Sequence, residues 1–261
     1  AIFGFAPNYN VTGLDTSSFW KSQKSLIPFL PGTLEEIKLL KKDYKGHTFF
    51  GIKATEKKFK EKVADYRILH LAMHSLTLDN NLGNTSLVFT PFADDEEDGL
   101  LYSNEIRNLN INADLTILSA CKTGTGELAA GEGVLSLSRM FLLAGSSSVL
   151  MTLWSVDDNS SKGLMKDFYN YLAQDKSVSE ALRLSKLTFL KDASKLHSHP
   201  FFWSGFIHLG KDTNIQLKFL EGYNKADGMK KNNCVYDFKN FKTNSATLAQ
   251  GLLFLLNNTT Q

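Results

Sequence analysis

The sequence predicts an α/β fold: a mostly parallel sheet with helices on both faces, in a three-layer α/β/α arrangement. Short apolar runs without polar alternation recur along the chain, as expected of strands that are buried on both faces. Segments with helical periodicity separate these runs, as in strand–helix–strand units. The chain has 261 residues, of which 43% are hydrophobic, so it can bury a large core.

In the first part of the chain, strands are predicted at residues 2–6, 48–51 and 67–72, and helices at 33–44 and 54–63. The helix at 33–44 opens with Thr33-x-x-Glu36, the spacing of a capping box. A hairpin is predicted next, with strands at 86–90 and 99–102 around the acidic residues 94–98.

In the second part, the most apolar strands are predicted at 114–120 and 148–156, and a last short strand at 206–209. Helices are predicted at 131–143, 160–173 and 177–190. The helix at 131–143 has an apolar face that includes Val134, Leu137 and Phe141, and the helix at 177–190 opens with the capping-box spacing Ser177-x-x-Glu180.

The chain is predicted to divide at residue 210. Residues 1–210 form the α/β domain, and residues 211–261 form a C-terminal appendage that is partly disordered, because they are rich in Asn and Lys and have weak periodicity. The first residue is not Met, so the chain is expected to be part of a larger polypeptide.

Composition argues against several classes of function. Lys and Arg total 29 against 27 Asp and Glu, without a basic block, so neither nucleic acid nor a membrane surface is expected as a partner. The longest apolar run near the end of the chain, 251–256, is too short to cross a membrane, and the N-terminus lacks the basic start of a signal peptide. Two cysteines without a CxxC pair indicate a reducing, cytoplasmic location, and no metal or cofactor is expected.

Two predicted strands end on residues that can do chemistry, His74 and Cys121. In parallel sheets, ligands and reacting groups gather at the carboxyl ends of the strands. A cysteine attacks as a thiolate, and a nearby imidazole favours that form. The glycine-rich turn after Cys121 can offer backbone N–H groups to an oxyanion. Taken alone, Cys121 is better explained as a buried structural cysteine, and it is His74 that shifts the interpretation towards a nucleophile.

Four other histidines are predicted to be structural. His70 lies inside the strand at 67–72 and should point into a helix-covered layer. His197, His199 and His208 are interpreted as structural, and the pair His197-x-His199 does not predict a metal site because no carboxylate or third ligand is placed with it.

The segments ILHLAMHS, ADLTILSACKTGTGELAAGEGVLSLSRMFLLAGSSSVLMTLWSVDDNSS and HPFFWSGFIHLG resemble the CHAT family, the caspase-like peptidases related to separase. The resemblance covers roughly residues 1–210. It implies a cysteine-type endopeptidase, a thiol protease, in which His74 and Cys121 form a dyad that works through a thioester. It also implies a protein or peptide substrate, a bacterial source, and activation by a fused or partner module.

Further site residues follow from the same resemblance. The family usually has Thr-His-Gly where this chain has Met73-His74-Ser75. The resemblance implies that the residue after the histidine offers its backbone N–H to the oxyanion, and Ser75 still has this group. The backbone N–H groups of Ser75 and Cys121 are therefore expected at the oxyanion. The stretch LWSVDD implies that Asp158, with Asp157 beside it, favours Lys or Arg before the scissile bond. An equally good explanation of Asp158 is a helix N-cap.

Two other functions remain open. Gly126-x-x-x-x-Gly131 has the opening spacing of a phosphate-binding loop, but Glu132-Gly133 follows in place of Lys-Ser/Thr. Gly124-x-Gly126-x-x-Ala129 fits the loose dinucleotide pattern, which leaves a nucleotide-binding module as an alternative. The other alternative is a catalytically silent caspase-like domain that only binds partners.

Overall fold

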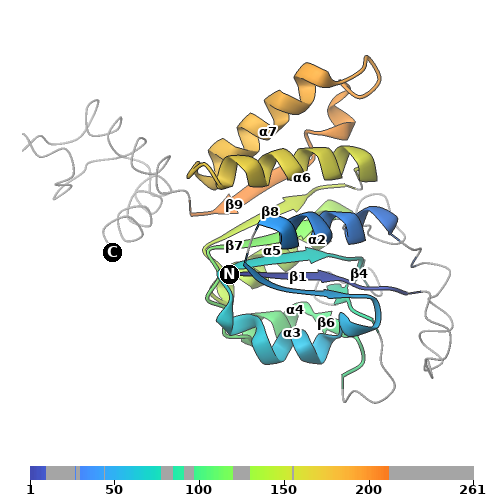
Figure 1. Cartoon of the computed structure of the whole chain (residues 1–261). Coiled ribbons are helices and arrows are strands. Elements are labelled where there is room, and N and C mark those ends of the chain that lie inside the picture. The colour runs from blue at the N-terminus through green and yellow to red at the C-terminus, as the bar shows by residue number, and fades with distance from the viewer. Residues whose placement is uncertain are drawn as a thin grey trace, which may run out of the picture. The chain divides into compact units, whose positions relative to one another are not determined.

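The computed structural model describes residues 1–9, 27, 30–43, 45–77, 85–90, 97–119, 130–154 and 156–211, without the side chains of 31, 39–43, 130–136, 158 and 159. The chain divides into two units, residues 1–210 and 211–261. The first unit contains all the helices and strands that the structure describes (Figure 1). The partial disorder of residues 211–261 stays a prediction, because Lys211 is the only residue of this segment among the described residues.

A six-stranded sheet forms the middle of the domain, in the order β2-β1-β3-β7-β8-β9. Neighbouring strands are parallel except for the last pair, in which β9 runs antiparallel to β8. The strands are β1 (Ile2–Ala6), β2 (Gly46–Phe50), β3 (Ile68–Ala72), β7 (Leu115–Ser119), β8 (Ser148–Thr152) and β9 (Phe206–Gly210). The mostly parallel sheet predicted from the apolar runs is therefore confirmed.

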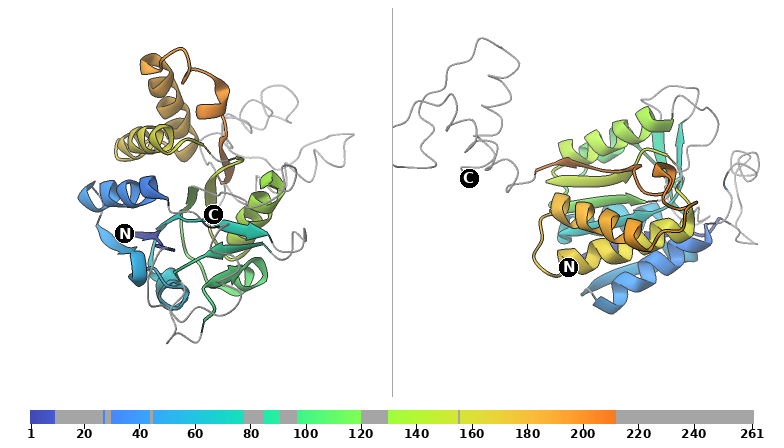
Figure 2. Two further views of the ribbon diagram at one scale, coloured as in Figure 1. Left: turned by 90° about the vertical axis from the view of Figure 1, so that its right-hand side faces the viewer. Right: turned by 90° about the horizontal axis from the view of Figure 1, so that it is seen from above.

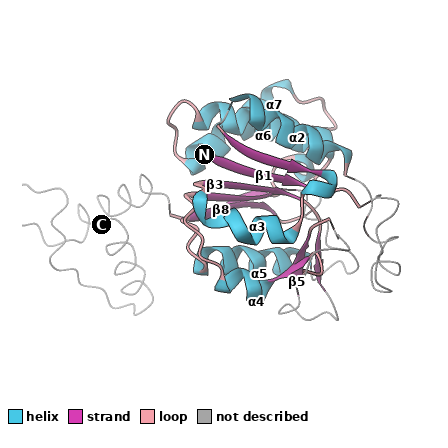
Figure 3. Ribbon diagram, turned by 60° about the horizontal axis from the view of Figure 1, so that its bottom comes forward, coloured by secondary structure: helices cyan, strands magenta, loops and turns pink. Residues whose placement is uncertain are grey.

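Helices cover both faces of this sheet, as Figures 1 and 2 show. One layer contains α2 (Pro31–Asp43), α6 (Asp158–Leu172) and α7 (Val178–Asp192). The opposite layer contains α3 (Glu56–Lys62), α4 (Ser103–Asn108) and α5 (Ala130–Leu143), and Figure 3 shows the sheet between the two layers. The predicted three-layer α/β/α arrangement is confirmed.

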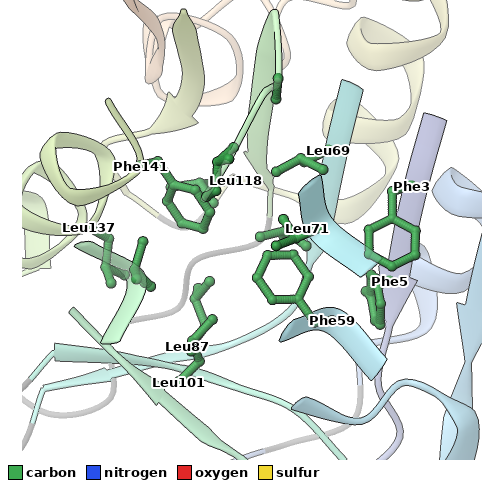
Figure 4. Packing of buried hydrophobic residues seen from close by; sticks show 14 of the residues in the cluster. Phe3, Phe5, Phe59, Leu69, Leu71, Leu87, Leu101, Leu118, Leu137 and Phe141 are labelled. Carbon is green, nitrogen blue, oxygen red and sulfur yellow. The ribbon is translucent and has the colours of Figure 1, made fainter. Parts of the chain in front are cut away.

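The pleat of the strands sends alternate side chains into the two layers. On β1, Phe3 and Phe5 belong to the core on the α3 and α5 side, whereas Ile2 and Ala6 belong to the core on the α2 and α6 side. All of these residues are buried, so the strand reads as an uninterrupted apolar run. Figure 4 shows Phe3 and Phe5 beside Phe59 of α3.

A smaller antiparallel sheet has the order β4-β5-β6. It consists of β4 (Ser75–Thr77), β5 (Thr85–Val88) and β6 (Leu100–Tyr102). The pairing of β5 with β6 confirms the predicted hairpin. Sequence analysis missed β4 and α4, because segments this short carry too few residues to show a period.

The capping box predicted for α2 is wrong. The helix begins at Pro31, where the fixed φ of proline suits a first turn, so Thr33 lies inside the helix. The Thr33 hydroxyl donates to the carbonyl of Leu30 at 2.8 Å, and the Glu36 carboxylate faces His70. By contrast, the hydroxyl of Ser177 does cap α7, because it accepts a hydrogen bond from the backbone N–H of Glu180 at 3.3 Å.

Candidate active site

The carboxyl ends of β1, β3 and β7 lie at one edge of the large sheet, because these strands are neighbours and run parallel. His74 comes two residues after β3, and Tyr9 comes three residues after β1. The predicted strand 114–120 leads to Cys121, and its described part, β7, ends at Ser119. In an open parallel sheet this edge is where ligands bind.

His74 is buried, with 1% of its surface exposed, and its backbone is held on both sides. Its N–H donates to the Tyr9 hydroxyl at 3.2 Å, and its carbonyl accepts from the N–H of Val88 at 2.9 Å. The same hydroxyl donates to the carbonyl of Val88 at 2.8 Å, and the rings of Tyr9 and His74 lie 5.2 Å apart. Tyr9 therefore fixes the turn that presents His74.

Sequence analysis missed Tyr9. A signal was present, because Tyr9 follows the predicted strand 2–6 and so had to emerge at the same edge as His74. Its hydroxyl was not recognised as a contact for the turn at His74, because that contact joins residues 65 apart in sequence.

Cys121 lies outside the described residues, as does the whole glycine-rich turn to Ala129. The described part of β7 constrains how the chain reaches it. The register pairs Ile68 with Leu115 and Ala72 with Ser119, an offset of 47 residues. His74 and Cys121 are separated by the same 47 residues, so they follow the last pair by equal lengths of chain.

Ser75, the predicted oxyanion residue, is the first residue of β4 and is fully buried. Its Cα is paired with that of Leu87 on β5. Its hydroxyl has no hydrogen-bond partner in the part of the chain that the structure describes. A buried hydroxyl in this state loses its hydration without compensation.

Replacing Ser75 by alanine is therefore expected to stabilise the protein by about 1 kcal/mol, because the substitution removes an unsatisfied polar group. Urea unfolding measures the change. The matched control is Ser148→Ala, since the Ser148 hydroxyl is equally buried but donates to the carbonyl of Asp114 at 2.9 Å. That control should lose about 1 kcal/mol. The same sign of change for both variants would contradict the prediction.

The two aspartates before α6 differ in what the structure shows. Asp157 is the N-cap of α6, because its carboxylate accepts from the backbone N–H of Ser160 at 3.0 Å and lies 3.1 Å from the Ser160 hydroxyl. Asp158 is the first residue of the helix, and its side chain is outside the described set. The capping role considered for Asp158 therefore belongs to Asp157.

The four histidines that were predicted to be structural have structural partners. His70 is completely buried within the α2 and α6 layer. His197 lies 2.9 Å from the Ser194 hydroxyl, and His208 lies 2.9 Å from the Ser179 hydroxyl. His199 caps a short 3-10 helix at 200–202 by accepting from the N–H of Phe201 at 3.2 Å.

One group of carboxylates has the spacing of a metal site among the described residues: Glu56, Glu97 and Glu105. A cation already lies between them, because the Lys60 ammonium is 2.7 Å from a carboxylate oxygen of each. Burial raises the pKa of Glu56 to about 7, against the opposing effect of Lys60. The three carboxylates raise the pKa of Lys60 against the effect of its own burial. The cluster is an internal ion pair that joins α3 to α4.

Within the described ranges, no helix combines the length and the apolar character that crossing a membrane requires.

Comparison with known proteins agrees with this architecture. A family model described as the CHAT domain matches residues 8–211. Proteins of mouse and human, both named tetratricopeptide repeat protein 28, are 32% identical to the chain over 120 and 116 residues. These alignments cover 44% of this chain and 5% of each relative, so the chain spans a small fraction of the curated relatives that it matches. The family model runs through most of the 261 residues, and its span contains His74, Cys121 and five of the six strands of the main sheet. The chain therefore belongs to the CHAT domain family.

Proposed function

We propose that the protein is a cysteine endopeptidase in which Cys121 is the nucleophile and His74 its proton-transfer partner. The observation that carries this proposal is the register of β3 and β7, whose offset equals the separation of the two residues. Adjacent parallel strands in this register have their carboxyl ends at the same edge of the sheet, and the chain continues from these ends towards His74 and towards Cys121. Membership of the CHAT family, which is related to caspase-like peptidases, supports the same chemistry.

The proposed reaction begins when the Cys121 thiolate attacks the carbonyl carbon of a peptide bond. Backbone N–H groups of Ser75 and Cys121 stabilise the oxyanion that forms. When the C–N bond breaks, the leaving amine takes its proton from His74, and a thioester remains on Cys121. Water then attacks the thioester with His74 as general base, which releases the acid and restores the thiol. His74 donates a backbone hydrogen bond to the Tyr9 hydroxyl and accepts one from the N–H of Val88, and these bonds support the role by fixing its backbone.

The substrate and its control are also proposals. Asp158, with Asp157 beside it, favours Lys or Arg before the scissile bond through charge pairing. A fused or associated module switches the activity on, and the repeat proteins with which this chain aligns over a short part of their length make such a module reasonable. The proposed location is the cytoplasm of a bacterium.

The test uses the whole chain under reducing conditions, with fluorogenic peptides that carry Arg, Lys, Leu, Met or Asp before the bond. Cys121→Ala should reduce cleavage at least about a thousandfold, because it removes the nucleophile. Asp158→Ala should relax a preference for basic residues while cleavage persists. An electrophilic probe should label Cys121 faster than Cys234, even where a missing activator keeps turnover low.

The second candidate is a catalytically silent domain that binds partners. It is favoured by the names of the two relatives, which describe repeats and no enzymatic activity. This candidate replaces the peptidase if Cys121 reacts with the probe no faster than Cys234 does and if the Cys121→Ala variant cleaves the peptides at the same rate as the unaltered chain.

A further inference from the structure

A buried polar cluster lies between the large sheet and helices α2 and α6. It contains one residue from each of four elements: Glu36 of α2, His70 of β3, Ser119 of β7 and Tyr169 of α6. Their exposed fractions are 4%, 0%, 1% and 6%. Apolar residues such as Ala72, Ile117 and Phe168 form the core around them.

His70 is the centre of this cluster. Its Nδ1 lies 2.6 Å from the Tyr169 hydroxyl, and the two rings stack with their centroids 5.8 Å apart. Its Nε2 lies 3.1 Å from the Ser119 hydroxyl and 2.9 Å from Oε1 of Glu36.

Serine, histidine and glutamate are also the residue types of a hydrolytic triad. In such a triad the imidazole meets the serine at one ring nitrogen and the carboxylate at the other, whereas here the Ser119 hydroxyl and the Glu36 carboxylate both lie at Nε2 of His70. These three residues therefore do not have the arrangement of a second active site. Nor does hydrophobic burial explain them, because apolar side chains of similar volume stabilise a core at least as well as a buried ionic group does. Directed hydrogen bonds, in contrast, fix the relative position of the elements that they join.

The place of the cluster in the sheet indicates which position is fixed. His70 precedes His74 by four residues on β3, and Ser119 precedes Cys121 by two residues on β7. The contact between His70 and Ser119 thus joins the two strands just before each leads to its member of the proposed dyad. Glu36 and Tyr169 hold the imidazole from the helix layer.

We propose that His70 is a positioning residue for the proposed peptidase reaction. Anchored by Glu36 and Tyr169, it holds the Ser119 hydroxyl and so fixes the end of β7 against the end of β3. This inference rests on the proposed function. When the contact is lost, the end of β7 moves relative to His74, and a displacement of about 1 Å is enough to weaken catalysis a hundredfold.

The pH profile of the Cys121 thiol separates positioning from general stability. At pH 6 a thiol reacts well only where a neighbouring group such as an imidazolium favours the thiolate, whereas at pH 9 most thiols ionise unaided. A misplaced Cys121 should therefore lose reactivity at pH 6 and keep it at pH 9. A change that merely lowered the stability of the folded protein would expose the thiol and speed the reaction at both pH values.

The experiment measures the rate at which iodoacetamide alkylates Cys121 in the whole chain, by mass spectrometry of the peptide that contains it. Ser119→Ala removes the hydroxyl that His70 contacts, and Tyr169→Phe removes a hydroxyl that holds His70. The matched control is Ser146→Ala, which removes a buried hydroxyl that contacts Thr116, also on β7, at 2.9 Å. Thermal unfolding of each variant verifies that it is folded.

Ser119→Ala is expected to slow alkylation at pH 6 about tenfold and at pH 9 less than about twofold. Tyr169→Phe should change the profile in the same direction and replaces Ser119→Ala if that variant does not fold. Ser146→Ala should keep the wild-type profile. A wild-type profile in the folded Ser119→Ala or Tyr169→Phe variant, or an equal change in Ser146→Ala, would overturn the positioning role.

The proposed function can fail separately in the same experiment. If Cys121 of the unaltered chain reacts at pH 6 no faster than free glutathione, the thiol is not activated, and the peptidase proposal fails whatever the variants do. If Cys121 is activated and the variants match the unaltered chain, only the role of His70 is lost.

Discussion

Replacing Lys60 by methionine is expected to lower the free energy of unfolding by about 4 kcal/mol at pH 8, because it leaves the buried Glu56 carboxylate without its cation. Glu56 is 1% exposed, whereas the side chains of Glu97 and Glu105 are 31% and 35% exposed. Solvent screens the last two, so most of the loss comes from Glu56. Urea unfolding of the variant and the unaltered chain measures the difference.

The loss should be smaller at pH 5. The pKa of Glu56 in the folded protein is raised to about 7, above the value of 4.5 that it has when unfolded. A group of this kind contributes stability that is fully present below 4.5 and lost as the pH rises to about 7. Without Lys60 the pKa of Glu56 rises further, so Glu56 is neutral at pH 5 and the variant is penalised mainly at higher pH.

The matched control is Lys162→Met, which removes the cation of an exposed ion pair with Glu35. Both side chains of that pair are substantially exposed, so the expected loss is below about 1 kcal/mol. Equal losses for the two lysine variants, or a loss for Lys60→Met that did not change between pH 5 and pH 8, would show that the carboxylate cluster is solvated.

Replacing Gly145 by alanine is expected to destabilise the protein by about 4 kcal/mol. There is no space for a Cβ at this position, and its backbone conformation is unfavourable for a residue with a side chain. Gly145 has φ of 114° and ends α5, where the N–H of Ser146 donates to the carbonyl of Phe141 at 2.9 Å. An added Cβ would lie 2.1 Å from the carbonyl oxygen of Ile111, which is a backbone atom. The segment between α4 and β7 would have to shift to make room.

Gly163→Ala provides the matched control for this prediction. Gly163 lies inside α6, and an added Cβ there would meet nothing within 4 Å. Because alanine forms helix better than glycine, this variant should gain about 0.5–1 kcal/mol. Thermal unfolding of both variants tests the pair, and a loss of less than about 1 kcal/mol for Gly145→Ala would refute the argument.

The strands of the large sheet were predictable because each has a local cause. β1, β7 and β8 are buried on both faces, so each is a short apolar run that no amphipathic helix would show. β8 nevertheless ends at Thr152, four residues before the predicted end at 156. Apolar character continues into Leu153 and Trp154, where it serves packing rather than strand pairing.

Glu36 illustrates what local patterns miss. With Thr33 it fits a capping box, but the helix begins earlier, and the Glu36 carboxylate pairs with His70 on β3. Nothing near Glu36 in the sequence indicates that partner, because it is 34 residues away and on another element. The ion pair between Lys60 and Glu97 was hidden for the same reason.

The sequence by itself determined the three-layer class and the family, and it is the basis for proposing His74 and Cys121 as the dyad, because these inferences depend on apolar runs and on residues at strand ends. Only the tertiary structure decided the register of β3 and β7, the hydroxyl of Tyr9 at His74, and the cluster around His70. Each of these joins residues far apart in the chain. Their free energy depends on distance and direction in the folded state, which no local pattern records.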